Sequence, residues 1–359
     1  MIEIDGSYLE GGGQTLRTAC ALSAITKKPC RVFNIRKNRP KPGLMPQHLL
    51  GIQALSQLCN GRLEGDFLGS EEITFYPGEV YRDRVSVNIP TAGSITLVLQ
   101  TLIPPALFAP APIKIIFDGG ATDTFFSPTI DHFRFCFLKT LEKITEVTEA
   151  RPLLIEVNVI KRGYYPEGGA KVEVIVSPFR LKPLNLTERG PLKKITAISG
   201  ASEFLKEKKV AERQLMGVRE VLGKLKLPVE EKVEYYDTRC PGSQICLTAE
   251  FENTVVGTDN LGKLGKRAED VGKEAALELL KEQKTGACLD KHSADQILPY
   301  MALSDKSQVT VSEITDHCKT NIWVIEKLAQ YRNEISGAGF LEGGFEIDGN
   351  LITWISKKI

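Results

Sequence analysis

Residues 6–26 read GSYLEGGGQTLRTACALSAIT, a glycine-rich turn that passes directly into a largely apolar helix. Glycines let backbone N–H groups approach a ligand closely, and a helix N-terminus favours anions. We therefore interpret the turn as facing a phosphate, with Glu10 available for a metal and Arg17 one helical turn further on. The same glycines also suit a tight turn without a ligand. Neither a P-loop nor a GxGxxG dinucleotide fingerprint is present here.

Composition limits the class of protein. The 359 residues are 42% apolar and 25% charged, as in a globular protein of one large or two ordinary domains. The net charge of +1 means that any basic binding site is local. No membrane span or secretory signal is recognised, so we expect a cytoplasmic protein. The eight cysteines include no CxxC pair, which argues against zinc and against a disulfide framework.

A pattern of helix, strand and second helix occurs three times. The first helices are predicted at 13–26, 92–108 and 293–303, the strands at 30–36, 113–119 and 308–314, and the second helices at 44–59, 127–144 and 319–331. Further strands are expected at 72–78, 153–160, 170–177, 343–349 and 351–356. In the second helices apolar residues fall on one face. The repetition predicts an α/β fold whose three units close around a pseudo-threefold axis.

The spacing of the repeats reveals an insertion. The first two units begin about 79 residues apart, but the third begins about 200 residues later. We expect a large domain from residues 1–183 and 286–359, and a small inserted α/β domain at 184–285. Its elements are predicted at 194–200, 212–225, 232–238, 243–251 and 264–283. About 100 residues suffice for an independent core.

A basic loop, RKNRPKPG at 36–43, precedes Gln47 and His48 at the start of a helix. The guanidinium groups of Arg36 and Arg39 suit phosphate oxygens, and the prolines stiffen the loop. The alternative is an ordinary solvated basic loop.

The remaining histidines differ in their setting. His132 lies within an apolar helix and is expected to be structural. His292 precedes Asp295, which either orients a cation or caps a helix. His317 is expected at a strand end, just before a helix. An imidazole there could act as base, ligand or nucleophile, or simply cap the helix.

Six motifs occur in one order over nearly the whole chain: GSYLEGGGQTLR, NIRKNRPKPGLMPQHL, AGSITLVLQTLIP, RGYYPEGGAKVEV, ADQILPYMAL and HCKTNIWVIEKL. This series resembles the RNA 3′-terminal phosphate cyclases. One departure is Ala170, where the family usually has a third glycine.

The resemblance implies both a fold and a reaction. The fold would consist of three βαβαββ units, as in enolpyruvate transferases, with the small domain inserted before the third unit. The enzyme, an ATP-dependent ligase, would convert an RNA 3′-phosphate to a 2′,3′-cyclic phosphate. Its intermediates would be a covalent histidinyl–AMP on His317 and an RNA adenylate, with release of pyrophosphate and AMP.

The resemblance also assigns roles residue by residue. Glu10 would hold Mg²⁺ or Mn²⁺ against the ATP phosphates. The residues around the triphosphate or the RNA terminal phosphate would be Arg17, Arg36, Arg39, Gln47 and His48. The nucleotide-binding residues would be Gln14, Gln100, Pro128, His292, Asp295 and Gln296. Among these, His292 and Pro128 would face the two sides of adenine.

Two other functions are compatible with parts of the sequence. One is a non-catalytic, cyclase-like ribosome-biogenesis factor, which would lack the nucleophilic histidine that His317 provides here. The other is an enolpyruvate transferase, which shares the threefold architecture but has no insert of this kind. The expected partners are ATP and RNA with a 3′-phosphate end, without a membrane. A homo-oligomer is left open.

Overall fold

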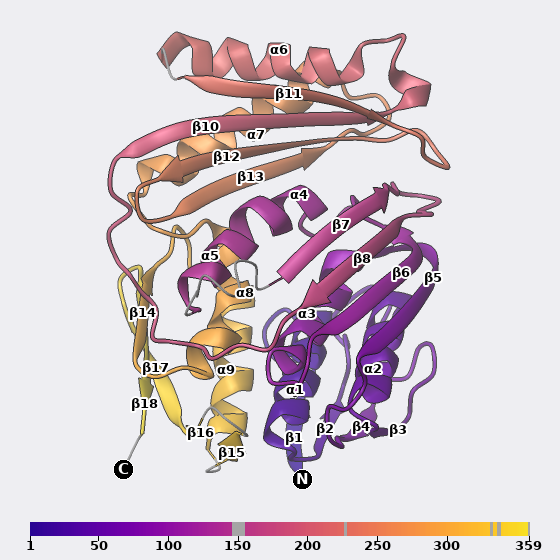
Figure 1. Ribbon diagram of the computed structural model, residues 1–359, viewed down its shortest axis with the longest axis vertical. Coiled ribbons are helices and arrows are strands. Elements are labelled where there is room, and N and C mark those ends of the chain that lie inside the picture. The colour runs from indigo at the N-terminus through magenta and orange to yellow at the C-terminus, as the bar shows by residue number, and fades with distance from the viewer. Residues whose placement is uncertain (146–154, 226–227, 331–332, 336–338, 358–359) are drawn as a thin grey trace.

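The computed structural model describes residues 1–145, 155–225, 228–330, 333–335 and 339–357. Helices and small sheets alternate along these segments, so the predicted α/β class is confirmed. Figure 1 shows the N- and C-termini at one end of the molecule and helices α6 and α7 at the other. Among the described helices, none combines the length and the hydropathy that crossing a bilayer requires.

Three four-stranded sheets share one strand order. The first contains β1 (Ile2–Asp5), β2 (Cys30–Phe33), β4 (Ile73–Tyr76) and β3 (Arg62–Glu64). The second contains β5 (Arg84–Ser94), β6 (Ile113–Ala121), β8 (Lys171–Val176) and β7 (Ile155–Lys161). The third contains β9 (Asn185–Leu186), β14 (Ser307–Thr310), β18 (Leu351–Ser356) and β17 (Gly343–Asp348).

In each sheet the first pair of strands is parallel and the other two pairs are antiparallel. This shared order supports the predicted repeat, whereas the threefold axis stays a prediction. A separate two-stranded ribbon contains β15 (Asn333–Ile335) and β16 (Gly339–Leu341).

The helices between these sheets form the centre of the larger hydrophobic core. They are α1 (Gly13–Thr26), α2 (Pro46–Leu58), α3 (Ile95–Ala106), α8 (Lys291–Ala302) and α9 (Asp316–Ala329). Helix α1 packs against α2, α3 and α9, and α8 packs against α9. Because the N-terminal ends of several of these helices meet, polar side chains far apart in the sequence are brought together.

The predicted helix 127–144 is not a uniform α-helix. It consists of α4 (Ile130–His132), a π-helical turn at Phe133–Phe137, and α5 (Leu138–Lys143). Such π-turns occur frequently at functional sites. The sequence indicates an apolar helical face but carries no signal for the wider turn.

Other predicted boundaries shift by a few residues. Helix α1 begins and ends where the periodicity predicts. Helix α3 begins at Ile95 rather than 92, because β5 runs up to Ser94. Strand β5 itself was not predicted, although its buried residues Val85, Val87 and Ile89 alternate with exposed ones as in a strand with one buried face. The predicted strand 153–160 begins outside the described residues and continues as β7.

The residues between β9 and α8 form a second sheet-and-helix layer. It contains β11 (Val229–Tyr236), β10 (Leu192–Ser202), β12 (Ser243–Phe251) and β13 (Val255–Leu261), in that order. It also contains α6 (Val210–Leu222), α7 (Ala268–Lys284) and two short 3₁₀ turns at Glu203–Leu205 and Gly223–Leu225. Its buried apolar residues form a cluster of their own.

That second core supports our proposal that residues 184–285 are a separate inserted domain. One detail concerns its first residues. Strand β9, at residues 185–186, pairs with β14 and so belongs to the third sheet by its hydrogen bonds. By strand pairing, the chain therefore leaves the third sheet just after its first strand.

Helices α6 and α7 approach each other at two glycines. A Cβ added to Gly217 would lie 1.9 Å from the carbonyl oxygen of Glu269, and one added to Gly272 would lie 1.8 Å from that of Gln214. Close packing of this kind cannot accommodate an extra methyl group without separating the helices.

We predict that Gly217→Ala lowers the free energy of unfolding of the insert by about 1–3 kcal/mol, because overpacking forces α6 away from α7. The matched control is Gly223→Ala, whose new methyl group would meet no atom within 4 Å. Urea unfolding followed by circular dichroism measures both. Equal stability of the two variants would contradict the close approach.

Candidate active site

The glycine-rich turn brings two other segments against the start of α1. A Cβ on Gly13 would lie 2.1 Å from Nε2 of His48, so the imidazole occupies the space that a side chain would need. A Cβ on Gly12 would lie 3.5 Å from Nη2 of Arg39 and 3.8 Å from Cε1 of His317. The missing side chains therefore let α2, the basic loop and α9 approach the N-terminus of α1.

The N-terminus of α1 has free backbone donors. Its N-cap is Gly12, which offers no side-chain acceptor, and its first turn contains no acidic residue. The first N–H groups of a helix lack partners within the helix, and together with the helix dipole they favour an anion. This arrangement is consistent with the predicted phosphate-facing turn.

Glu10 lies between a guanidinium group and an imidazole. Its Oε2 accepts a hydrogen bond of 2.8 Å from Nη2 of Arg39 and lies 3.3 Å from Nε2 of His317. All three side chains are partly exposed, at 35%, 37% and 46% respectively. The group is therefore accessible to a ligand while its members hold one another in place.

His317 is the second residue of α9, whereas the sequence predicted it just before a helix at 319–331. Helix α9 begins three residues earlier than predicted because Thr315 caps it, accepting a hydrogen bond from the backbone N–H of Cys318. Burial lowers the pKa of His317. Glu10 opposes this change, and the nearby cations Arg17 and Arg39 add to it. At neutral pH the imidazole is therefore neutral, with a nitrogen lone pair.

Two residues of α1 contact the start of α8. Nε2 of Gln14 donates a hydrogen bond of 2.8 Å to Oδ2 of Asp295. Burial raises the pKa of Asp295 to about 6, against the opposing effects of His292, Gln14 and Arg17. Burial likewise lowers the pKa of Arg17 to about 10, and Asp295 limits the change. Asp295 and Arg17 thus lie in a poorly hydrated environment, where the charge of a ligand would interact strongly with them.

A small cavity of about 20 Å³ joins several predicted residues from different helices. Gln14 and Arg17 of α1, Gln100 of α3 and Gln296 of α8 all line it. Nε2 of Gln296 donates to the carbonyl of His292, whereas its buried Oε1 has no hydrogen-bond partner among the described residues. The same holds for the buried Oε1 of Gln14. These oxygens are buried acceptors without a partner among the described residues.

Sequence reasoning missed two residues that connect the helices. Oγ1 of Thr18 donates a hydrogen bond of 2.6 Å to Oδ1 of Asn321, and Nδ2 of Asn321 donates one of 2.7 Å to the carbonyl of Asp295. Both side chains are buried. The signal available in the sequence was a polar residue on the apolar face of each helix.

His48 is buried, and burial together with Arg17 and Arg36 lowers its pKa to about 3. Its Nδ1 accepts a hydrogen bond from the backbone N–H of Met45, so Nε2 carries the proton. Gln47 lies next to Gly93: a Cβ added to this glycine would be 3.4 Å from the Cβ of Gln47. His48 therefore offers an N–H donor rather than a charge.

The two predicted arginines of the basic loop behave differently. Arg39 faces Glu10, as described above. Arg36 adopts a left-handed backbone conformation, with φ of 55°, and its Nη1 donates to the carbonyls of Lys41 and Gly43. One face of that guanidinium thus holds its own loop in shape.

The predicted adenine pair lies on separate segments. The carbonyl of Pro128 accepts a hydrogen bond of 2.9 Å from Oγ1 of Thr96 near the start of α3. His292 is exposed in the first turn of α8, and its ring meets that of His132 edge-on at 5.8 Å. Both residues remain predicted ligands of a base.

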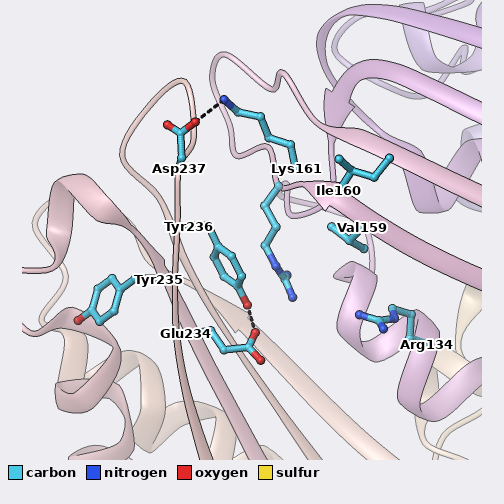
Figure 2. A pocket seen from close by; sticks show the side chains of 9 residues that line it. Arg134, Val159, Ile160, Lys161, Glu234, Tyr235, Tyr236 and Asp237 are labelled. Atoms are coloured by element: carbon cyan, nitrogen blue, oxygen red, sulfur yellow. Dashed lines mark hydrogen bonds and ion pairs between the residues drawn. The ribbon is translucent and has the colours of Figure 1, made fainter.

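A larger cavity, of about 400 Å³, lies apart from these residues (Figure 2). It separates the end of β7 from the end of β11, and Lys161 forms an ion pair of 2.8 Å with Asp237 across it. Figure 2 also shows Arg134 and Tyr236 pointing into this space. No residue predicted for the site lines it.

The geometry described so far brings a neutral imidazole, a carboxylate, two cations and an uncapped helix N-terminus together. Such a combination is suited to binding a phosphorylated ligand and to nucleophilic attack on it. The cavity between α1, α3 and α8 adds unpaired amide oxygens beside it.

Comparison with known proteins is consistent with this chemistry. A family model described as RNA 3′-terminal phosphate cyclase matches residues 8–335. Proteins named RNA 3′-terminal phosphate cyclase are similar over most of their length. That of Pyrococcus abyssi is 44% identical over 98% of this chain and 96% of its own. Those of Pyrococcus furiosus and Sulfurisphaera tokodaii are 45% and 42% identical, each over 94% of this chain and 96% of their own.

The raised pKa of Asp295 predicts a pH-dependent stability difference. Between an unfolded pKa near 3.8 and the folded value of about 6, the folded protein binds the proton more tightly. The ionised carboxylate therefore costs stability above pH 6, and this cost disappears below about pH 4. Asp295→Asn should stabilise the fold by about 1–3 kcal/mol at pH 8 and hardly at all at pH 4.

Urea unfolding at a series of pH values would measure this difference. The control is Asp118→Asn, an exposed aspartate in β6. A stabilisation by Asp295→Asn that is equally large at pH 4 and pH 8 would contradict the burial argument.

Proposed function

Because the chain belongs to the RNA 3′-terminal phosphate cyclase family, we propose that it converts the 3′-phosphate end of RNA to a 2′,3′-cyclic phosphate with consumption of ATP. The observation that carries this proposal is the position of His317 beside Glu10 and Arg39 at the open N-terminus of α1. The relatives named above are cyclases, which favours this activity over an enolpyruvate transferase or a non-catalytic factor.

In the first step, the neutral Nε2 of His317 attacks the α-phosphorus of ATP. A P–N bond forms while the bond from the α-phosphorus to the bridging oxygen breaks, and pyrophosphate leaves with that electron pair. The lowered pKa of His317 supports this role, since a protonated imidazole has no lone pair to donate. The product is AMP linked to the histidine.

In the second step, an oxygen of the RNA 3′-phosphate attacks the same phosphorus and the P–N bond breaks. The adjacent 2′-hydroxyl then attacks the RNA phosphorus, loses its proton and displaces AMP. This route has a chemical reason, because a phosphate oxygen is a poor leaving group until adenylylation makes the leaving group AMP.

Phosphate recognition is assigned to groups that converge on the glycine-rich turn. The unpaired N–H groups of α1 and the guanidinium groups of Arg17 and Arg39 supply positive charge. His48, held neutral, donates from Nε2. Arg36, in the basic loop, and Gln47, in the first turn of α2, complete the predicted set of phosphate-binding residues.

The nucleotide side is assigned to the residues around the cavity between α1, α3 and α8, which at about 20 Å³ has room for about one water molecule. The sugar and base would therefore lie outside this cavity, with Gln14, Gln100 and Gln296 forming the wall behind them. Asp295 is held by Gln14 at the same wall. Pro128 and His292 would stack on adenine from opposite sides.

The residues present fit a divalent metal of the Mg²⁺ or Mn²⁺ type. Glu10 is a partly exposed carboxylate next to the positive groups that would bind phosphate. Mg²⁺ is commonly bound by one or two carboxylates together with substrate phosphates. When bound, such a metal would neutralise charge on the triphosphate. We also propose a cytoplasmic location, which agrees with eight buried, unpaired cysteines.

We predict that the protein incubated with ATP labelled at the α-phosphate retains an acid-labile, alkali-stable label. The variant His317→Ala should retain none, because it lacks the attacking nitrogen. Lys327→Ala, a change on the same helix away from the site, should retain the wild-type amount. Undiminished labelling of His317→Ala would reject His317 as the nucleophile.

We further predict that Arg39→Ala weakens transfer of AMP to RNA ends more than self-adenylylation. Loss of a charge-assisted contact to the terminal phosphate should cost about 1.5–3 kcal/mol in the RNA step. Single-turnover measurements of the two half-reactions would separate them. Lys37→Ala, an exposed cation of the same loop, is the control. Equal losses in both half-reactions would place Arg39 on ATP instead.

A further inference from the structure

Three buried side chains outside the proposed active site bring metal-binding atoms together. His132, Cys136 and Asp290 are completely buried, and one donor atom from each lies within 4.8 Å of the others. His132 and Cys136 are four residues apart across the π-helical turn, and Asp290 is the N-cap of α8. The three atoms are nitrogen, sulfur and oxygen.

The imidazole of His132 lacks the hydrogen bonds that a buried ring normally makes. Neither nitrogen has a hydrogen-bond partner within the described part of the chain. Nε2 lies 3.2 Å from Oδ1 of Asp290, but the approach does not meet the geometry of a hydrogen bond. A buried polar group without a partner requires an explanation, and an ion is one of the standard ones.

The carboxylate of Asp290 is oriented by neighbours on both oxygens. Oδ1 accepts from the backbone N–H groups of His292 and Ser293, and Oδ2 accepts from the hydroxyl of Ser293 and the N–H of Gly257. Hydrogen bonds of this kind hold the carboxylates that ligate metals. They also leave a completely buried negative charge facing the imidazole and the thiol.

A second thiol lies next to the first. Cys246, on β12, is also completely buried, and the neighbouring thiol of Cys136 raises its pKa along with burial. Gly257 leaves room for the sulfur of Cys136, because a Cβ added to this glycine would lie 2.1 Å from that sulfur. Cys246 thus lies beside Cys136, whereas the donor atoms that lie within 4.8 Å of one another are those of His132, Cys136 and Asp290.

We propose that His132, Cys136 and Asp290 bind Zn²⁺. Nitrogen, sulfur and oxygen are the ligand atoms that zinc takes in proteins, and a thiolate does not suit Mg²⁺ or Ca²⁺, which prefer oxygen. Binding would displace the thiol proton of Cys136 to solvent, so that its sulfur ligates as a thiolate.

Such a site would be structural, since all three ligands are buried. It would link the π-helical turn to the N-cap of α8, which the backbone N–H of Gly257 already joins to the insert by a hydrogen bond. Figure 1 shows α4 directly beneath strands β12 and β13. The sequence contains no CxxC pair, so it gave no sign of this site.

The test is metal binding by the intact protein. Protein purified without chelators should contain stoichiometric zinc that Glu10→Gln retains, because Glu10 lies in the other site. Replacement of the zinc by Co²⁺ should produce thiolate-to-cobalt charge-transfer absorption and intense visible bands of tetrahedral cobalt. Cys136→Ser should lose most of the charge-transfer band while keeping the wild-type circular dichroism spectrum.

Cys59→Ser is the matched control, since Cys59 is equally buried and lies near the thiol of Cys20. It should keep both the zinc and the cobalt spectrum. Loss of the spectrum in Cys59→Ser but not in Cys136→Ser would overturn the assignment.

If the variants do not fold, measurements on the wild-type protein still test the zinc proposal. Folded wild-type protein that binds neither zinc nor cobalt with thiolate absorption would overturn the proposal. So would thiol counting that shows Cys136 joined to Cys246 as a disulfide. In either case His132 and Asp290 would form an ion pair without a metal.

Discussion

The missing side chains of Gly12 and Gly13 allow the segments of the candidate site to meet. The imidazole of His48 occupies the volume that a Cβ on Gly13 would take, and Arg39 and His317 flank Gly12 at ordinary contact distance. Any larger residue at Gly13 would push α2 away from α1. Because α1 also packs on α3 and α9, such a displacement would propagate into the centre of the larger core.

The pKa shifts of the ionisable groups in the site follow from this close packing. Several ionisable groups lose water together, so burial moves His48 and His317 toward the neutral form and weakens the basicity of Arg17. The negative charges of Glu10 and Asp295 only partly balance the cations near them. An anionic ligand would supply the missing charge, and this is why a site built around a helix N-terminus suits nucleotide and RNA phosphates.

The insert contacts the rest of the chain through polar groups with defined geometry, since the backbone N–H of Thr129 donates a hydrogen bond of 2.7 Å to Oδ2 of Asp259. On the large-domain side of this contact, Arg162 binds both carboxylate oxygens of Asp131 at 2.7 Å and one oxygen of Asp123 at 3.1 Å. Next to it, Tyr164 lies over Gly242 of the insert, where a Cβ would be 2.2 Å from its ring. The cost of desolvating a buried ion pair offsets much of its Coulombic attraction, whereas removal of one partner leaves an uncompensated buried charge. The proposed zinc site would lie beside this contact.

The sequence by itself determined the elements that depend on local pattern. Apolar periodicity located α1, α2 and α9, and the ordered motifs pointed to the residues of the site, including Glu10 and His317. Periodicity records which side of an element faces the core, so it was available but overlooked at β5, and it gave no sign of the wider π-helical turn. Only the tertiary structure decided which atoms meet. Gln14 and Asp295 are 281 residues apart and Thr18 and Asn321 are 303 apart, and contacts of this kind depend on how the whole core packs rather than on any local stretch.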